Sequence, residues 1–297
     1  MTSRPRILRF SARLGFSAAA RVVPARRCAP RSLMYHSVDD SGSLLSISPK
    51  NLRLQLAWLR QNDFTGLTAD EFIAAARSHD PAPNTIFITF DDGYQNLLTD
   101  GVPLLQEFNF SATVFIPTDF VGSTIDAFRR EYPSTYTLGG AATTAHSDID
   151  SSIEHCAALP VMTWDEIARA KAAGVDIQSH SAAHHVLPRL APNELADDLA
   201  RSRAAIENHL GHRADLICYP YGACTAKVAA AAAHAGYSAG VLGDRFAPPR
   251  NVMQLARVGV NDSITTDDLA YLLSSAADCE AALRRRLRPA PSHEVQS

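Results

Sequence analysis

The stretch Thr85–Gly93, with the sequence TIFITFDDG, decides how the rest of the chain is interpreted. Its first six residues are rich in β-branched and aromatic side chains, which predicts a buried strand. Two adjacent acids, Asp91 and Asp92, follow directly. Neighbouring carboxylates at the end of an apolar strand are costly to desolvate unless a cation lies beside them or one acid stays protonated. Taken alone, the same residues are also typical of a solvated turn that ends at Gly93.

Strand and helix patterns alternate on both sides of this stretch. Predicted strands cover residues 32–38, 85–90, 111–116, 175–179, 216–219, 237–242 and 255–260. Predicted helices start at Pro49 and Thr163 and cover 69–77, 95–108 (broken near Gly101 and Pro103), 192–210, 225–235 and 266–275. This alternation predicts an α/β fold with a mostly parallel sheet, either open and doubly wound or closed into a barrel. About seven strands favour a barrel that is incomplete.

Two regions lack this alternation. Residues 118–160 show no clear periodicity, and so long a loop inside a compact domain is often functional or mobile. Residues 1–31 carry eight arginines and no acid, so the net charge of −3 leaves −3 − 8 = −11 for the rest. This balance argues against nucleic-acid binding by the main body.

The basic N-terminus permits several interpretations. A disordered or amphipathic arm that touches an acidic membrane surface is favoured over a cleaved signal peptide, because Arg13 and Arg21 interrupt the segment that should be apolar. A solvated tail is the third interpretation. The sequence contains no run of about 18 apolar residues, so it predicts no membrane span. The compartment therefore stays open between cytoplasm and cell envelope.

Five cysteines are scattered through the chain, at positions 28, 156, 218, 224 and 279. Their odd number and irregular spacing predict neither a disulfide framework nor a zinc knuckle.

Polar residues gather where the predicted strands end. Four groups of them follow four different strands: His36, Asp91 with Asp92, His180 with His184, and Tyr221. The carboxyl ends of parallel strands meet at one rim, and ligand sites of α/β folds lie there. On its own segment His36 could equally be a packed core histidine.

His180 and His184 are four residues apart, so in a helical turn both imidazoles would face one side, as metal ligands do. Together with one carboxylate of the Asp91–Asp92 pair they predict a two-histidine, one-carboxylate site for a divalent metal that keeps a position open for water. One acid would bind the metal, and the other would accept a proton.

Three motifs now match a known family. Thr89-Phe90-Asp91-Asp92-Gly93, His180-Ser181-x-x-His184 and Tyr219-Pro220-Tyr221-Gly222 resemble the first three motifs of the polysaccharide deacetylases, the NodB-homology family or carbohydrate esterase family 4. The resemblance covers about residues 31–275. It implies an irregular (β/α)7-type barrel in a single domain, and metal-dependent hydrolysis of an N-acetyl group on a sugar.

The resemblance also implies roles for individual residues. Asp91 corresponds to the general base, and Asp92, His180 and His184 to the metal ligands. Tyr221 corresponds to the residue whose backbone N–H binds the oxyanion. The implied ion is Zn²⁺, with Co²⁺, Ni²⁺, Fe²⁺ and Mn²⁺ as alternatives.

Two positions depart from the family pattern. The third motif usually begins with an arginine that orients the base, and here Cys218 takes this place; Arg257 is a candidate replacement. The late Leu-x-His motif, which supplies the general acid, is missing. Leu33-Met34-Tyr35-His36 instead resembles the poly-N-acetylglucosamine deacetylase branch, in which this motif lies on the N-terminal strand, and His36 would be the acid.

The chain is therefore expected to comprise a basic arm (1–31), a catalytic domain (32–275) and a tail (276–297). We expect a hydrolase that removes N-acetyl groups from an amino-sugar polysaccharide or oligosaccharide. A related deacylase or deformylase acting on a small or lipid-linked substrate, and a non-catalytic carbohydrate-binding relative, are the alternatives. The oligomeric state cannot be predicted.

Overall fold

The computed structural model describes residues 30–78, 81–127, 146–243, 251–274 and 277. The sheet and all the predicted site residues belong to one compact unit, Arg27–Thr265. A second unit comprises Met1–Arg26 and Thr266–Ser297, and its described part contains helix α10 (Thr266–Leu272). The predicted arm is therefore almost wholly outside the described residues, as is nearly all of the predicted tail. No helix in the described ranges has the length and apolar character needed to cross a membrane.

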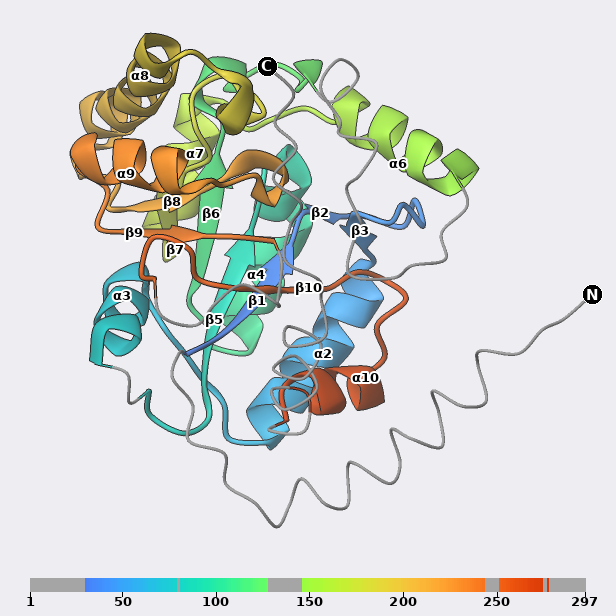
Figure 1. Cartoon of the computed structure of the whole chain (residues 1–297). Helices are drawn as coiled ribbons and strands as arrows, with labels where there is room; N and C mark the ends of the chain where they lie inside the picture. Colours follow the sequence, from blue (N-terminus) through green and yellow to red (C-terminus); the bar gives the residue numbers. More distant parts are fainter. Residues whose placement is uncertain (1–29, 79–80, 128–145, 244–250, 275–276, 278–297) are drawn as a thin grey trace, which may run out of the picture. The chain divides into compact units, whose positions relative to one another are not determined.

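A parallel sheet forms the centre of the larger unit (Figure 1). Its strand order is β10-β1-β5-β6-β7-β8-β9, and the short β4 also pairs with β5. The strands are β1 (Arg31–Tyr35), β4 (Thr65–Gly66), β5 (Thr85–Phe90), β6 (Ala112–Ile116), β7 (Val175–Ser179), β8 (Leu216–Cys218), β9 (Ala239–Val241) and β10 (Val258–Gly259). The sheet curls into an incomplete barrel, which confirms the predicted (β/α) fold. A separate parallel pair, β2 (Ser37–Val38) and β3 (Ser46–Ile47), follows β1.

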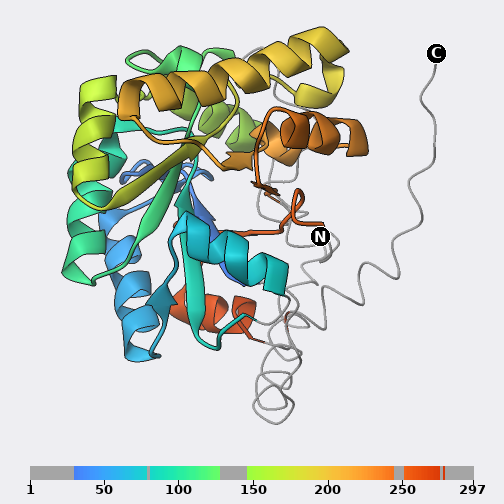
Figure 2. The same cartoon turned by 90° about the vertical axis from the view of Figure 1, so that its left-hand side faces the viewer.

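Helices surround the sheet. They are α2 (Pro49–Gln61), α3 (Ala69–Ser78), α4 (Val102–Glu107), α6 (His146–Ala158), α7 (Trp164–Ala172), α8 (Pro192–Leu210) and α9 (Ala226–His234). Most begin at the residues that the sequence predicts, because local side chains cap them. Ser48 accepts a hydrogen bond from the Asn51 N–H at the start of α2, and Thr163 forms a capping box with Glu166 at the start of α7. Helices α8 and α9 lie side by side against the later strands (Figure 2).

The concave face of the sheet is filled by apolar side chains. Phe72 of α3 stacks on Phe87 of β5 with 4.1 Å between ring centroids, and both side chains are almost fully buried. Phe115, Leu216 and other inward-facing residues of β6, β8 and β9 join the same cluster. Burial of each large side chain contributes about 1.5–3 kcal/mol. This face is thus a packed core, which leaves the carboxyl ends of the strands for a site.

Several local features differ from the predicted elements. The first strand is interrupted at His36, which separates β1 from β2. The helix after Asp92 starts as a π-helical turn, Leu97–Gly101, and continues as α4. Pro103, which has no N–H to donate, explains why regular α-helical bonding is lost before it. Within the aperiodic region 118–160, a 3-10 turn (Thr118–Phe120) and α6 are present, and residues 128–145 lie outside the described part.

Candidate active site and metal centre

The predicted site residues lie together at the carboxyl ends of β1, β5, β7 and β8. His36 follows β1, Asp91 follows β5, His180 follows β7, and Tyr221 lies three residues beyond β8. The register explains this placement, because Tyr35 pairs with Phe90 and so puts His36 opposite Asp91. The Asp91 N–H also donates to the Tyr35 carbonyl at 2.9 Å. All six predicted residues thus share one rim, as parallel strands require.

Three of them form a compact group of metal-ligand type. One ligand atom each of Asp92, His180 and His184 lies within 4.8 Å of the other two, and all three residues are buried. Oδ1 of Asp92 faces Nε2 of His180 at 3.4 Å and Nε2 of His184 at 3.3 Å. Neither carboxylate oxygen accepts a hydrogen bond of ordinary geometry, although both are buried. A buried carboxylate without such partners is costly, and a cation between it and two imidazoles would offset that cost.

The charge state of Asp92 suits this arrangement. Burial alone would raise the pKa of Asp92, but the two adjacent imidazoles outweigh it and hold the pKa well below its usual value. Asp92 is therefore ionised, as a metal ligand must be. The donor set of two histidines and one carboxylate is one that divalent zinc accepts in catalytic sites.

His180 is oriented through its other ring nitrogen. Nδ1 lies 2.8 Å from the carbonyl oxygen of Cys218, which can only accept, so Nδ1 carries the proton. Nε2, the other ring nitrogen, points toward Asp92 and would bind a metal in its deprotonated form. A ligand histidine normally has such a partner, which fixes its tautomer.

The loop that carries the histidines differs from the prediction. His180 and His184 do not share a helical turn; residues 180–186 form an irregular loop between β7 and a 3-10 turn. Ser181 has φ 63° and His184 φ 54°, a left-handed conformation that breaks helical geometry. The two rings still meet edge to face, with centroids 4.8 Å apart. The residues are close, as predicted, but a strained loop brings them together rather than helical spacing.

Strained backbone is concentrated at this site. The described non-glycine residues with positive φ include Asp92 (71°), Ser181, His184 and Tyr221 (58°). The others are Asp63, Asn84 and Asn109, which lie in turns. Each strained position costs about 1–3 kcal/mol and persists only where its surroundings fix it.

A buried ion pair lies beside the metal-type group. Nη1 and Nη2 of Arg257 each donate to one carboxylate oxygen of Asp91 at 2.7 Å. Nη1 also donates to Thr89 Oγ1 at 2.8 Å, and Nε to the Leu242 carbonyl at 3.1 Å. Burial alone would raise the pKa of Asp91, but the Arg257 charge and hydrogen bonds lower it below its usual value. Asp91 is thus held ionised and in a fixed orientation.

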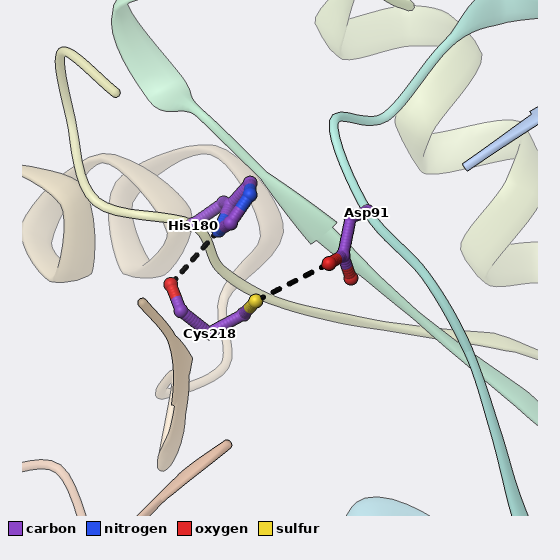
Figure 3. A group of neighbouring side chains, drawn as sticks. All are labelled: Asp91, His180 and Cys218. Atoms are coloured by element: carbon purple, nitrogen blue, oxygen red, sulfur yellow. Dashed lines mark hydrogen bonds between the residues drawn. The ribbon is translucent and has the colours of Figure 1, made fainter. Parts of the chain in front are cut away.

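Cys218 connects this pair to the histidine loop (Figure 3). Its Sγ lies 3.4 Å from Asp91 Oδ2 and 2.9 Å from Arg257 Nη2, while its carbonyl binds His180. One ligand-type atom each of Asp91, His180 and Cys218 also lies within 4.8 Å of the other two. The Arg257 guanidinium already supplies the cation there, and a metal would have to displace it from a two-pronged ion pair. We therefore assign the metal-type site to Asp92, His180 and His184.

His36 also lies close to Asp91. Its Nε2 is 4.0 Å from Asp91 Oδ2, and 12% of its side chain is exposed. Burial lowers the pKa of His36 despite the opposing effect of Asp91 and Asp92. A lowered pKa makes the imidazolium a stronger proton donor.

Tyr221 lies at the centre of a tight turn, Pro220–Gly222. Its ring packs edge-on against His184, with centroids 4.8 Å apart. It also joins an apolar cluster with Tyr94, Leu45 and residues of α6. The aperiodic region 118–160 therefore contributes, through α6, to the wall next to the histidines.

Two functional candidates were less evident from the sequence. Arg257 was only a candidate replacement for the missing arginine, because nothing in a sequence shows that residue 257 reaches residue 91. Asp198, a buried acid that binds the histidine loop, was not singled out at all. The sequence does hold a signal for Asp198: this acid stands between Leu195 and Leu199, on the apolar face of the predicted helix 192–210.

Comparison with known proteins agrees with this geometry. The sequence pattern of the family described as "Polysaccharide deacetylase" matches residues 78–240. The Bacillus subtilis (strain 168) protein YxkH, whose name assigns it to the polysaccharide deacetylases, is 27% identical over 236 residues, which are 78% of this chain and 72% of YxkH. Poly-β-1,6-N-acetyl-D-glucosamine N-deacetylase of Escherichia coli (strain K12) is 35% identical over 99 residues, 32% of this chain and only 14% of that protein.

The fold also resembles solved structures. IcaB from Ammonifex degensii superimposes with a TM-score of 0.65 at 20% identity, covering 82% of this chain and 97% of IcaB. At this identity the likeness concerns the fold.

Proposed function

Because this chain belongs to the polysaccharide deacetylase family, we propose that it removes N-acetyl groups from an amino-sugar polysaccharide or oligosaccharide and releases acetate. One observation carries the proposal. The Asp92–His180–His184 group, the Asp91–Arg257 ion pair and His36 lie on one rim. Hydrolysis of an amide needs an activated water, a base and an acid, and this rim offers a residue for each.

Asp92, His180 and His184 would hold the divalent ion, with Zn²⁺ proposed first and Co²⁺, Ni²⁺, Fe²⁺ and Mn²⁺ as alternatives. When bound, such an ion polarises a carbonyl and lowers the pKa of water.

The chain's own residues move the protons. Asp91, ionised and held by Arg257, accepts a proton from the attacking water. The backbone N–H of Tyr221 donates to the carbonyl oxygen as negative charge develops there. His36 then donates a proton to the sugar nitrogen as the C–N bond breaks. One water is consumed, and the products are acetate and a free amine.

The name of a relative supports an amino-sugar polymer. A protein that matches part of this chain is named as a deacetylase of poly-β-1,6-N-acetyl-D-glucosamine. His36, directly after β1, fits the same branch, because the late Leu-x-His motif is missing from the sequence.

The experiment measures acetate release by the purified full-length chain, freed of metal and reloaded with Zn²⁺, Co²⁺ or Ni²⁺. The substrates are β-1,6-linked N-acetylglucosamine oligomers and small acetylated or formylated amides. We expect acetate from the oligomers, and release slower by about 10²-fold or more from the Asp91→Asn variant. Turnover of small amides alone would indicate a deacylase of a different substrate class. Oligomer binding without turnover under any metal would indicate a non-catalytic relative.

A further inference from the structure

A buried acid on α8 supports the loop that carries the two histidines. Asp198 is 3% exposed. Its Oδ1 accepts a hydrogen bond from the Ala182 N–H at 3.0 Å, and its Oδ2 accepts one from the Ala183 N–H at 2.9 Å. Each oxygen of the carboxylate therefore binds one of two consecutive amides, and both amides lie between His180 and His184.

The loop needs this support because its backbone is not regular. Ser181 and His184 both adopt positive φ. Such residues keep their conformation only where neighbouring groups fix it. The loop does receive other bonds: the Thr118 N–H donates to the Ser181 carbonyl at 3.3 Å, and the Ser181 hydroxyl accepts from the His184 N–H at 3.1 Å. Asp198 is the charged partner among these contacts, and hydrogen bonds to a charged group are stronger than neutral ones.

The same helix also holds the strand end that precedes the loop. Ser202, one turn along α8 from Asp198, shares a hydrogen bond of 2.8 Å with Ser179, the last residue of β7. The Tyr237 hydroxyl donates to Ser179 Oγ at 2.8 Å, which strengthens this attachment. Helix α8 therefore contacts the chain immediately before His180 and again between the two histidines.

We propose that Asp198 is a positioning residue of the metal centre: through the Ala182 and Ala183 amides it fixes the separation and orientation of His180 and His184. The proposal rests on the proposed function, because it takes these histidines as metal ligands. It adds a residue that touches neither metal nor substrate. Loss of groups that orient metal ligands typically lowers metal affinity by about 10–100-fold.

The test measures Zn²⁺ and Co²⁺ affinity by competition with a chelator, without any substrate. Asp198→Asn is close in shape and keeps one acceptor oxygen, but its NH₂ group cannot accept from the second amide. We expect metal affinity to fall about 10-fold in Asp198→Asn and about 100-fold in Asp198→Ala. The adjacent Asp197→Asn is the matched control, because Asp197 is exposed and pairs with Arg201, and its metal affinity should equal that of the unmodified protein.

Thermal unfolding with and without metal separates positioning from general stability. A ligand stabilises the native state according to its affinity, so a positioning role predicts a smaller increase in Tm on adding metal. A purely structural role would lower both Tm values equally and leave that increase unchanged.

Metal affinity in Asp198→Asn equal to that of the unmodified protein would overturn the proposal and leave the proposed function intact. An Asp198→Asn protein that does not fold would also overturn it, because the carboxylate would then serve the fold and not the loop. If the unmodified protein binds no divalent metal, the proposed metal centre itself fails, together with any role of Asp198 in it.

Discussion

Arg257 and Asp91 are 166 residues apart in the sequence, yet their side chains are joined by two hydrogen bonds of 2.7 Å inside the protein. Arg257 lies just before β10, which pairs with β1, and β1 pairs with β5. The sheet order therefore brings the guanidinium to the proposed base. Arg257 provides the two-pronged contact that only arginine offers. It does so from the segment before β10, whereas the family pattern expects an arginine at the position of Cys218, the last residue of β8.

Replacement of Arg257 tests this contact. Arg257→Lys keeps the charge but loses the fixed fork, so we expect kcat to fall by about 10²-fold with metal content unchanged. Arg257→Met leaves the Asp91 carboxylate buried without its partner, and should lower the free energy of unfolding by about 3–5 kcal/mol. Steady-state kinetics and urea denaturation measure the two effects. A fully active Arg257→Lys enzyme would show that the ion pair does not orient the base.

Asp91→Asn tests the base. The amide cannot accept the water's proton, so kcat should fall by about 10²-fold or more. Metal content, determined by elemental analysis, should stay the same because Asp92, not Asp91, is the proposed ligand. Turnover close to that of the unmodified enzyme would remove Asp91 from this role.

His184→Ala tests the metal group, and the adjacent His185 provides the control. We expect His184→Ala to lose its divalent ion on dialysis, because one of three protein ligands is gone. His185→Ala should retain the ion. Elemental analysis of both variants, purified side by side, gives the answer; equal metal content would contradict the assignment of His184.

His36→Gln tests the proposed acid. Glutamine can form hydrogen bonds but cannot give up a proton, so kcat should fall by about 10²–10⁴-fold while metal affinity is retained. Hydrolysis of an O-acetyl substrate with a good leaving group depends less on protonation of that leaving group by an acid. Its hydrolysis should therefore be less sensitive to the change, and equal losses on both substrates would argue against proton donation by His36.

The lowered pKa of Asp39, in the turn after β2, predicts how the free energy of unfolding depends on pH. Burial alone would raise the pKa of Asp39, but hydrogen bonds lower it to about 2, and the donors are Ser41, Ser37 and His155. The folded pKa lies below the value of about 3.9 expected in the unfolded chain. The stabilisation by Asp39 is therefore complete above about pH 5 and is lost as the pH falls toward 2.

Asp39→Asn provides the comparison for this prediction. The difference in the free energy of unfolding between the two proteins should be constant near neutral pH and should shrink between about pH 4 and pH 2. Urea denaturation followed by circular dichroism at several pH values measures it. A difference that does not change with pH would mean that the ionised carboxylate is not what stabilises this turn.

The sequence predicted the fold class and the grouping of the site residues because both depend on local patterns. Strand and helix periodicity defined the parallel sheet, and parallel strands bring their carboxyl ends together whatever their exact order. Helix α8 was predicted with its observed ends, Pro192–Leu210, since Pro192 and Gly211 mark them.

The remaining features depend on contacts that no local pattern encodes. The spacing of His180 and His184 suggested a helical turn, whereas tertiary hydrogen bonds hold a loop with two residues at positive φ. The contact of Arg257 with Asp91 requires knowledge of strand order. Helix α6 was missed because its sequence has weak amphipathic periodicity.

The position of β1 in the sheet also constrains how this protein can fold. Strand β1, which His36 directly follows, lies between β5 and β10, and Leu33 pairs with Ile88 on one side and with Val258 on the other. During synthesis the first strand must therefore wait for partners made much later, and its second edge stays unpaired until residues near 258 have left the ribosome. Contacts so distant in sequence slow folding and prolong the exposure of an apolar strand edge. In a nascent chain that stops short of residue 257, β1 would lack its second neighbour and Asp91 would lack its partner Arg257.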